Sequence, residues 1–335
     1  MGVFPMRIPV KYLIKRIIER IALLFVIVNF LFFLFNIIPI LFHFNPAEFY
    51  VPLTYKGISR SALIEAIDKQ WGLNEPLYIQ YIDYVKNMFT FHFGYSLSYG
   101  ESITTLVMQA VPVDLIILVP SLILSMILAI GLAMISIAKE GSIVDVINTN
   151  AAIFTYFIPA FWVFAIALYI LGFEMGVVPT NVAEAINGTH GIAYIAGLLK
   201  FASLPIILLT ILSYGVRMVL TRSYGVEITK SHFVTYLKAR GVPSRKILFK
   251  HVMRNSIIPA LTRTGIDFAF ILGGAVFVED IFNFYGMGEL IVQNAESFNV
   301  PVLQAAFFII NFYAVIVLLA VDLIYPFIDP RVRYE

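Results

Sequence analysis

The sequence predicts an all-α integral membrane protein with six transmembrane helices and both termini in the cytoplasm. Hydrophobic residues make up 60% of the 335 residues, charged residues only 13%, and the mean hydropathy is +0.88. This composition is typical of a chain embedded in lipid. Lipid offers the backbone no hydrogen bonds, so a spanning segment is either a helix of about 20 apolar residues or a strand of a closed barrel. The apolar runs here are long and lack the alternation of barrel strands, which favours helices.

The first predicted span has a second possible interpretation, because a basic start followed by an apolar run also describes a secretory signal. The apolar run after Arg20 is too long for a signal, and it leads to Pro39 rather than to a small-residue cleavage site. We therefore expect it to remain in the protein as a span. The six predicted spans cover residues 21–40, 111–137, 150–172, 201–220, 261–278 and 304–326.

The distribution of Lys and Arg predicts the orientation, because cytoplasmic loops carry an excess of these residues. Eighteen of the 23 basic residues fall on one side of the predicted membrane. They are Arg7, Lys11, Lys15, Arg16, Arg20, Lys139, Arg217, Arg222, Lys230, Lys238, Arg240, Arg245, Lys246, Lys250, Arg254, Arg263, Arg331 and Arg333. The other side has Lys56, Arg60, Lys69, Lys86 and Lys200. Both termini and the loop between spans four and five are therefore predicted to be cytoplasmic.

Residues 41–106 form the one sizeable segment predicted outside the membrane on the extracytoplasmic side. Their pattern indicates short amphipathic helices that pack as a cap. The sequence contains no long repeat and no low-complexity tract, so residues 1–335 are predicted to form a single transmembrane domain. Because the chain has no cysteine, disulfides, thiolate metal sites and cysteine nucleophiles are excluded.

The basic loop between spans four and five has the pattern of a helix, a turn and a second helix. Gly241 can take the positive φ that ends a helix, and Pro243 suits the first turn of the next one. Two interpretations stay open: an apolar edge for a partner protein, or a surface helix attracted to anionic lipid. The residues at helical spacing are Phe233, Tyr236, Leu237 and Arg240 before the turn, and Ile247, Leu248, His251 and Val252 after it.

The order Gly241, His251, Arg254, Asn255, Pro259 resembles the EAA loop of binding-protein-dependent ABC transporter permeases, specifically the first permease of the dipeptide and oligopeptide group. The resemblance extends over nearly the whole chain. Further matching stretches, in order, are GLNEPLYIQY (72–81), FGYSL (93–97) with Pro112, IPAFW (158–162), VVP (177–179), Arg222 with Glu227, VEDIFNFYGMGEL (278–290) and DLIYPFIDPRVRY (322–334).

The sequence departs from the family pattern in two places. Aligned on Gly241, the small Ala residues that name the EAA loop are replaced by Tyr236 and Leu237, and the acidic residue before them is Thr235. A charge contact from that position to an ATPase is therefore not expected. The GDLG-like motif on the outer side reads FHFG here, at residues 91–94.

The resemblance implies a type I ABC importer permease in the plasma membrane of a prokaryote. Its implied partners are a second homologous permease, two cytoplasmic ATPases, an extracytoplasmic solute-binding protein and membrane lipid, with no role for nucleic acid. ATP and Mg²⁺ would bind to the ATPases, and the chain itself has no GxxxxGK phosphate loop. The implied solute is a peptide, with an oligosaccharide as the alternative. The implied ATPase-docking residues, within a coupling loop at 222–260, are Phe233, Tyr236, Leu237, Arg240, Gly241, Pro243, His251, Arg254, Asn255 and Pro259.

Carboxylates at membrane depth are the other candidates, because charge there is costly and often functional. Asp114 and Asp267 are the two candidates for the translocation path, with burial against a polar neighbour as the alternative. We expect Asp322, near the inner end of span six, to pair with a cytoplasmic-side Arg. Outside the membrane, the acidic residues after span five fit either a contact with a binding protein or, by default, a solvated rim. They are Glu279, Asp280, Glu289 and Glu296.

Other functional classes have weaker support. The five histidines are scattered without an HExxH pair, so no metal site is predicted, and His251 is expected to pack within its loop. An ion-coupled carrier favours rings or pairs of buried charge, and an intramembrane enzyme needs a nucleophile and base within the spans. Neither pattern is present in the sequence. Asn187, Gly188 and Thr189 form a glycosylation sequon on the outer side.

Overall fold

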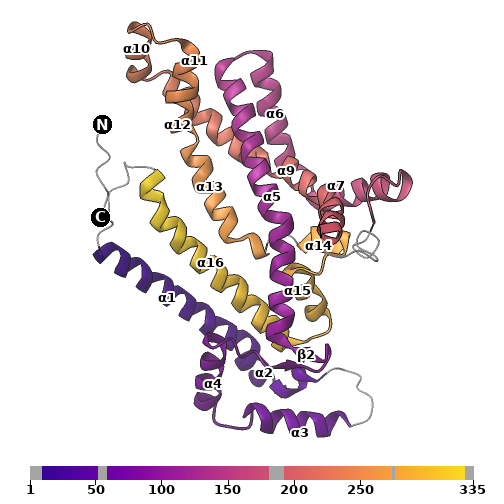
Figure 1. The fold of residues 1–335 in the computed structure, drawn as a ribbon. Helices are drawn as coiled ribbons and strands as arrows, with labels where there is room; N and C mark the ends of the chain where they lie inside the picture. The colour runs from indigo at the N-terminus through magenta and orange to yellow at the C-terminus, as the bar shows by residue number, and fades with distance from the viewer. Residues whose placement is uncertain (1–9, 52–58, 181–191, 274–275, 329–335) are drawn as a thin grey trace.

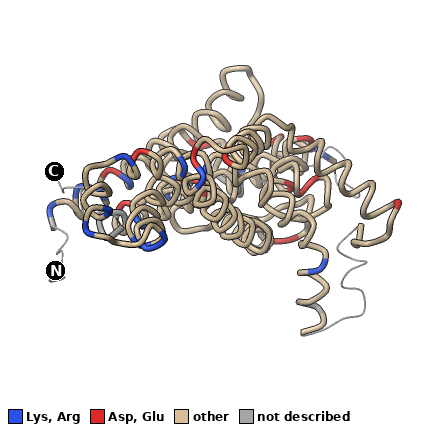
Figure 2. The backbone as a smooth tube through the Cα atoms, turned by 90° about the horizontal axis from the view of Figure 1, so that it is seen from above, with Lys and Arg blue, Asp and Glu red and all other residues tan. Residues whose placement is uncertain are grey.

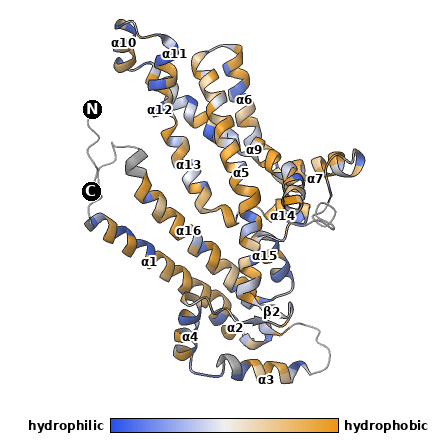
Figure 3. Ribbon diagram, viewed as in Figure 1, coloured by the Kyte–Doolittle hydropathy of each residue, from blue (hydrophilic) through white to orange (hydrophobic). Residues whose placement is uncertain are grey.

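The computed structural model describes residues 10–51, 59–180, 192–273 and 276–328. Asn187 and the basic residues Arg7, Lys56, Arg331 and Arg333 lie outside the described residues. Apart from one short hairpin, the described residues form helices and their connections, as predicted. The longest helices are apolar along most of their length (Figure 3).

The N-terminal third forms the first long helix and the cap (Figure 1). Helix α1 (Val10–Phe32) continues through a π turn (Phe33–Ile37) into α2 (Ile38–Leu41). The cap contains a 3₁₀ turn (Pro46–Tyr50), α3 (Arg60–Trp71), α4 (Leu77–Phe89) and an antiparallel hairpin of β1 (Tyr95–Ser96) and β2 (Glu101–Ser102).

The remaining helices form the body of the molecule. They are α5 (Ile103–Ala138), α6 (Ile143–Phe157), α7 (Ala160–Leu168) with a π turn (Tyr169–Glu174), α9 (Ile192–Thr229), α10 (His232–Ala239), α11 (Ser244–Lys246) with a π turn (Ile247–Val252), α12 (Met253–Ser256), α13 (Ile258–Ala269) with a 3₁₀ turn (Ile271–Gly273), α14 (Val276–Phe282), α15 (Met287–Glu296) and α16 (Val300–Ile328).

Four helices of the described chain are long and apolar enough to cross a membrane: Lys11–Leu41, Ile103–Ala138, Ala196–Thr229 and Val300–Ile324. These correspond to predicted spans one, two, four and six. If the bent helix pair Ile143–Phe157 and Ala160–Glu174 counts as one span, the number of candidate spans rises to five. The predicted count of six is therefore not confirmed, although the helical membrane fold is.

Predicted span three, at 150–172, is not one straight helix. The chain bends by 90° between α6 and α7, where Ile158 and Pro159 are both extended. A residue before proline is pushed away from helical angles, which explains the break. Predicted span five, at 261–278, is also interrupted, because α13 ends at Ala269. The following residues Ile271 and Leu272 turn into a buried cluster with Ile117 of α5.

Helices α5 and α9 form the most extensive helix pair of the body. Small residues allow α9 to approach its neighbours closely. A Cβ at Gly215 would overlap the backbone of Ala152 in α6, and one at Gly225 would overlap Ile137 in α5. The three helices therefore form a tightly packed unit.

The cap is attached to α1 and α16 by aromatic side chains. Phe32 of α1 packs with its ring centroid 5.2 Å from the rings of Tyr81 and Tyr84 in α4. Phe91 and Phe93, in the FHFG stretch that replaces the family's GDLG-like motif, both pack edge-on to Phe308 of α16 at 6.0 and 5.8 Å. This stretch is therefore an apolar anchor for the cap.

Candidate functional site

The predicted coupling loop lies at the opposite end of the molecule from the cap helices α3 and α4 (Figure 1). The helix, turn and helix are confirmed as α10, the turn at residues 240–243, and the run from α11 to α12. Helix α9 continues to Thr229, so residues 222–229 of the predicted loop are helical. Seen from this end, Lys and Arg gather mainly toward the left of the view (Figure 2).

The turn of the loop depends on Gly241. Its φ is +72°, and open space surrounds the position where a Cβ would lie. Its N–H donates to Lys238 O at 2.9 Å, and the next N–H, of Val242, donates to Leu237 O at 3.1 Å. These bonds satisfy carbonyls at the end of α10, as in other helices that end on a left-handed glycine. Pro243 then starts α11 from an extended conformation.

The inner face of the loop is buried against the body. Val234, Leu237, Ile247 and Val252 form one apolar cluster with side chains of α5, including Met134. Leu237, one of the residues implied as ATPase-docking, is only 8% exposed. Its side chain therefore faces this protein's own core.

The outer face of the loop presents two aromatic side chains to the surroundings. Phe233 is 49% exposed and Tyr236 is 59% exposed. The guanidinium of Arg240 lies 5.6 Å from the centroid of the Tyr236 ring, and Phe233 packs edge-on to His251 at 5.7 Å. His251 thus packs within the loop, as expected. We call Phe233, Tyr236 and Arg240 the aromatic face.

The remaining predicted docking residues lie at the base of the loop. Arg254 is exposed on α12, and the side-chain amide of Asn255 donates to His251 O at 2.7 Å. Pro259 is in the first turn of α13. Asn255 and Pro259 line an open cavity of about 540 Å³ together with Glu227.

Two ion pairs hold the end of α9 and the adjoining loop to α6 and to the turn between α5 and α6. Lys230 Nζ lies 2.8 Å from Glu140 Oε1. Arg222 forms a bidentate pair with Asp145, at 2.5 and 2.6 Å. Bidentate pairs of this kind fix orientation as well as charge. The end of α9 is therefore held to α6 directly beside the loop.

Asp267, a predicted path residue, lies in α13 between two arginines. One carboxylate oxygen pairs with Arg217 of α9, and the other lies 2.9 Å from Nε of Arg263. The three side chains line an open cavity of about 410 Å³, which Tyr156 and Phe270 also line. Asp267 therefore has polar neighbours, as the predicted alternative requires, and it also lines an open cavity.

Asp114, the other predicted path residue, is fully buried and is not close to Asp267. Its Oδ1 accepts the N–H of Met287 at 3.1 Å, and its carboxyl group lies beside that of Glu279. Oε2 of Glu279 accepts the N–H of Glu289 at 2.9 Å. A Cβ at Gly286 would overlap both carboxyl groups, so glycine is needed there for this approach. The cluster holds α5 to α14 and to the start of α15.

The default interpretation of the outer acidic residues as a solvated rim is wrong for two of them. Glu279 is 1% exposed and Glu289 is 8% exposed, whereas Asp280 and Glu296 are exposed. The carboxyl pair of Asp114 and Glu279 was not predicted. The signal in the sequence was the pair of glycines, at 286 and 288, which lets α15 approach the carboxyl groups.

Asp322 pairs with two arginines that the charge distribution predicts to be cytoplasmic. One carboxylate oxygen of Asp322 lies 2.5 Å from Arg20 and 4.0 Å from Arg16. Both arginines are on α1, so this contact joins the first and last long helices. Among the residues that the structure describes, no group of three or more His, Asp or Glu side chains is arranged to hold a metal ion.

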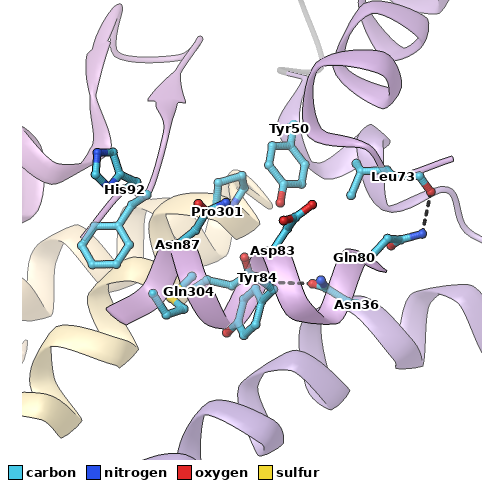
Figure 4. Close-up of a pocket in the computed structure, with 12 residues that line it drawn as sticks. Asn36, Tyr50, Leu73, Gln80, Asp83, Tyr84, Asn87, His92, Pro301 and Gln304 are labelled. Atoms are coloured by element: carbon cyan, nitrogen blue, oxygen red, sulfur yellow. Dashed lines mark hydrogen bonds between the residues drawn. The ribbon is translucent and has the colours of Figure 1, made fainter. Parts of the chain in front are cut away.

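A small polar cavity lies between the cap, α1 and α16 (Figure 4). Its volume is about 50 Å³, which is room for water but not for a peptide. Gln304 donates to Asn36 at 2.7 Å, and Gln80 donates to Leu73 O at 2.8 Å. Figure 4 shows Tyr50 and Asp83 pointing toward one another across it. We interpret this cavity as part of the attachment of the cap.

Comparison with known proteins gives the family. A family described as "Binding-protein-dependent transport system inner membrane component" matches residues 121–334, and its N-terminal companion matches residues 9–118. This chain therefore belongs to that family: it is a permease subunit of an ABC importer, a transport component of the inner membrane and not an enzyme. Permeases of this family work with ATPase and binding-protein partners.

Several curated relatives are similar over most of their length. The oligopeptide transport system permease protein AppB of Bacillus subtilis is 29% identical over 81% of this chain and 85% of its own. The glutathione transport system permease protein GsiC of Escherichia coli is 26% identical over 97% of this chain and 99% of its own. The dipeptide transport system permease protein DppB of Lactococcus lactis is 29% identical, with the same coverage as GsiC.

The geometry of the carboxyl pair predicts different outcomes for two substitutions of Glu279. Glu279→Gln keeps an oxygen for the N–H of Glu289 and adds an amide that can donate to Asp114, so stability should hardly change. Glu279→Ala leaves Asp114 and the N–H of Glu289 without this partner, which costs about 2 kcal/mol. Thermal unfolding of the detergent-solubilised permease measures both. Equal melting temperatures for the Ala and Gln variants would contradict the contact.

Proposed function

We propose that this chain forms half of the translocation path of an ATP-driven importer of peptides. The curated relatives named above are permeases for oligopeptides, glutathione and dipeptides. The alignments with GsiC and DppB extend over 99% of those proteins. Because the likeness includes the path-forming helices and not only the loop, it supports peptides as the solute class.

The proposed complex contains a second homologous permease, which forms the other half of the path. Two cytoplasmic ATPases bind ATP with Mg²⁺, and an extracytoplasmic binding protein delivers the solute. The sequence has no GxxxxGK phosphate loop, so in this proposal nucleotide binds to the ATPases. Its task is to convert the closure of the ATPases into movement of its helices.

The observation that carries this proposal is the two-sided loop. Its inner face shares one buried cluster with α5, and its base is joined to the turn between α5 and α6 by Lys230 and to α6 by Arg222. Its aromatic face is exposed. An ATPase that binds the aromatic face and moves would carry α5, α6 and α9 with it as a rigid body.

Within this path we assign the solute-facing position to Asp267 and not to Asp114. Asp267 lines an open cavity together with Arg217 and Arg263. Asp114 is fully buried and is engaged by Met287 and Glu279. Its position favours a structural role at the contact between α5 and α15.

Reconstitution of the complete complex in liposomes tests the function. With ATP, Mg²⁺ and the binding protein present, the vesicles should accumulate a labelled tripeptide against a gradient. Omitting ATP is the control and should abolish accumulation. Accumulation of an oligosaccharide in place of the tripeptide would contradict the assignment of the solute.

Replacing Gly241 should uncouple ATP hydrolysis from uptake. Valine at φ +72° is strained, so Gly241→Val would tilt α10 relative to α11 while leaving the long helices folded. We expect uptake per ATP hydrolysed to fall several-fold in proteoliposomes. Gly176→Val is the matched control, because Gly176 has φ +61° and open surroundings but lies outside the loop. Normal coupled uptake by Gly241→Val would contradict the role of this turn.

Docking should depend on apolar packing of Tyr236, since Thr235 stands where the family has an acidic residue. Tyr236→Ala removes a 59% exposed ring and should weaken binding of the ATPase about tenfold, as expected for an aromatic interface residue. Titration of purified ATPase onto the permease in nanodiscs measures this. Tyr78→Ala, which removes a 66% exposed ring in α4, is the control. Unchanged ATPase affinity for Tyr236→Ala would show that docking uses other contacts.

A further inference from the structure

The groove beside α13 contains a positive charge that the described part of the chain does not neutralise. Arg217 and Arg263 share the single carboxylate of Asp267. Arg217 is committed, since its side chain is only 3% exposed and its other N–H groups also have partners. These partners are Thr264 Oγ1 at 3.1 Å, Ser125 Oγ at 3.2 Å and Ser213 O at 2.7 Å.

Arg263 is different, because most of its donors are free. Its Nε lies 2.9 Å from Oδ1 of Asp267, and its side chain is 51% exposed. Neither Nη1 nor Nη2 has a partner among the residues that the structure describes. A guanidinium held by Nε still presents two parallel N–H groups, the geometry that binds a carboxylate through both oxygens.

The free donors of Arg263 lie where two cavities meet. Arg263 lines the cavity of about 410 Å³ beside Tyr156 and Phe270, and it also lines the cavity of about 540 Å³ beside Tyr224 and Glu227. Each volume falls within the range of about 300 to 1,000 Å³ that is usual for small-ligand sites. A short peptide therefore has room on either side of this arginine.

We propose that Arg263 binds the carboxylate group of the solute during its passage through the groove. Asp267 orients Arg263 from one side, and the buried Arg217 in turn holds Asp267, so the free N–H groups are pre-oriented. This inference rests on the proposed function: for a peptide, the group bound is its C-terminal carboxylate. It adds a specificity-determining contact inside the membrane protein, separate from selection by the binding protein.

A single introduced thiol gives a direct measure of occupancy. The chain has no cysteine, so Phe270→Cys creates the only thiol of this subunit, at a position that is 56% exposed on the wall of the cavity. The complete complex in nanodiscs is labelled with a maleimide, and the label on this subunit is followed by mass. Millimolar trialanine should slow labelling, and trialanine amide, which lacks the carboxylate, should not.

Variants of Arg263 in the same Phe270→Cys background test the contact itself. Arg263→Gln should raise the trialanine concentration for half-protection about tenfold, as expected for loss of a charge-assisted hydrogen bond. Arg263→Lys keeps the charge without the paired N–H groups. Its trialanine concentration for half-protection should lie between those of the parent and of Arg263→Gln. Lys200→Gln, which removes an exposed charge elsewhere on α9, is the control and should behave as the parent. Co-purification with the ATPases shows that each variant is folded.

Three results would overturn the inference. One is equal protection by trialanine and its amide, and another is full protection of the Arg263→Gln variant. The third is faster labelling of Arg263→Gln than of the parent when no peptide is present. That result would mean that the second permease or a lipid phosphate occupies the N–H groups of Arg263 in the parent and shields the thiol.

Uptake by the same complexes reconstituted in liposomes separates this inference from the proposed function. Normal tripeptide uptake without Arg263-dependent protection would overturn the carboxylate site alone. Arg263-dependent protection without tripeptide uptake would confirm the site and contradict the proposed transport of peptides.

Discussion

The pairing of charges on apolar helices determines how this protein is assembled. A charge taken out of water costs several kcal/mol unless it has a partner, so a charged side chain on such a helix constrains the helix opposite it. Three pairs in the body join different helices, and α9 takes part in two of them. The pairs are Arg20 with Asp322 between α1 and α16, Arg222 with Asp145 between α9 and α6, and Arg217 with Asp267 between α9 and α13.

This use of α9 connects the two functional regions of the molecule. Beside the coupling loop, Arg222 holds the end of α9 to α6, and Lys230 pairs with the turn between α5 and α6. About one helical turn further into the body, Arg217 reaches Ser125 of α5 and the carboxylate in the groove. A displacement of the loop therefore acts on the wall of the groove through contiguous packed elements, without a separate signalling route.

The local sequence pattern was enough to predict the helices and the turn of the coupling loop, but not which of its faces is buried. The period of apolar residues, Gly241 and Pro243 together predicted the helix, turn and helix, because these depend on neighbours in the chain. The same pattern did not distinguish Leu237, which is buried against α5, from Tyr236, which is exposed. Which edge of a short amphipathic helix is covered depends on the surface it meets, and that surface comes from residues about 100 positions away.

The sequence by itself determined that this is a helical membrane protein of a transport family, where its loop turns, and that Asp322 pairs with an arginine. Composition and residue spacing indicate the membrane fold and the turn, whereas the family follows from the resemblance of the ordered motifs. Only the tertiary structure decided that the chain breaks at Pro159, that Glu279 is buried beside Asp114, and that Arg263 has free donors in an open groove. The physical reason is distance along the chain: Arg217 and Asp267 are 50 residues apart. Whether a charge is satisfied depends on what folding brings to it.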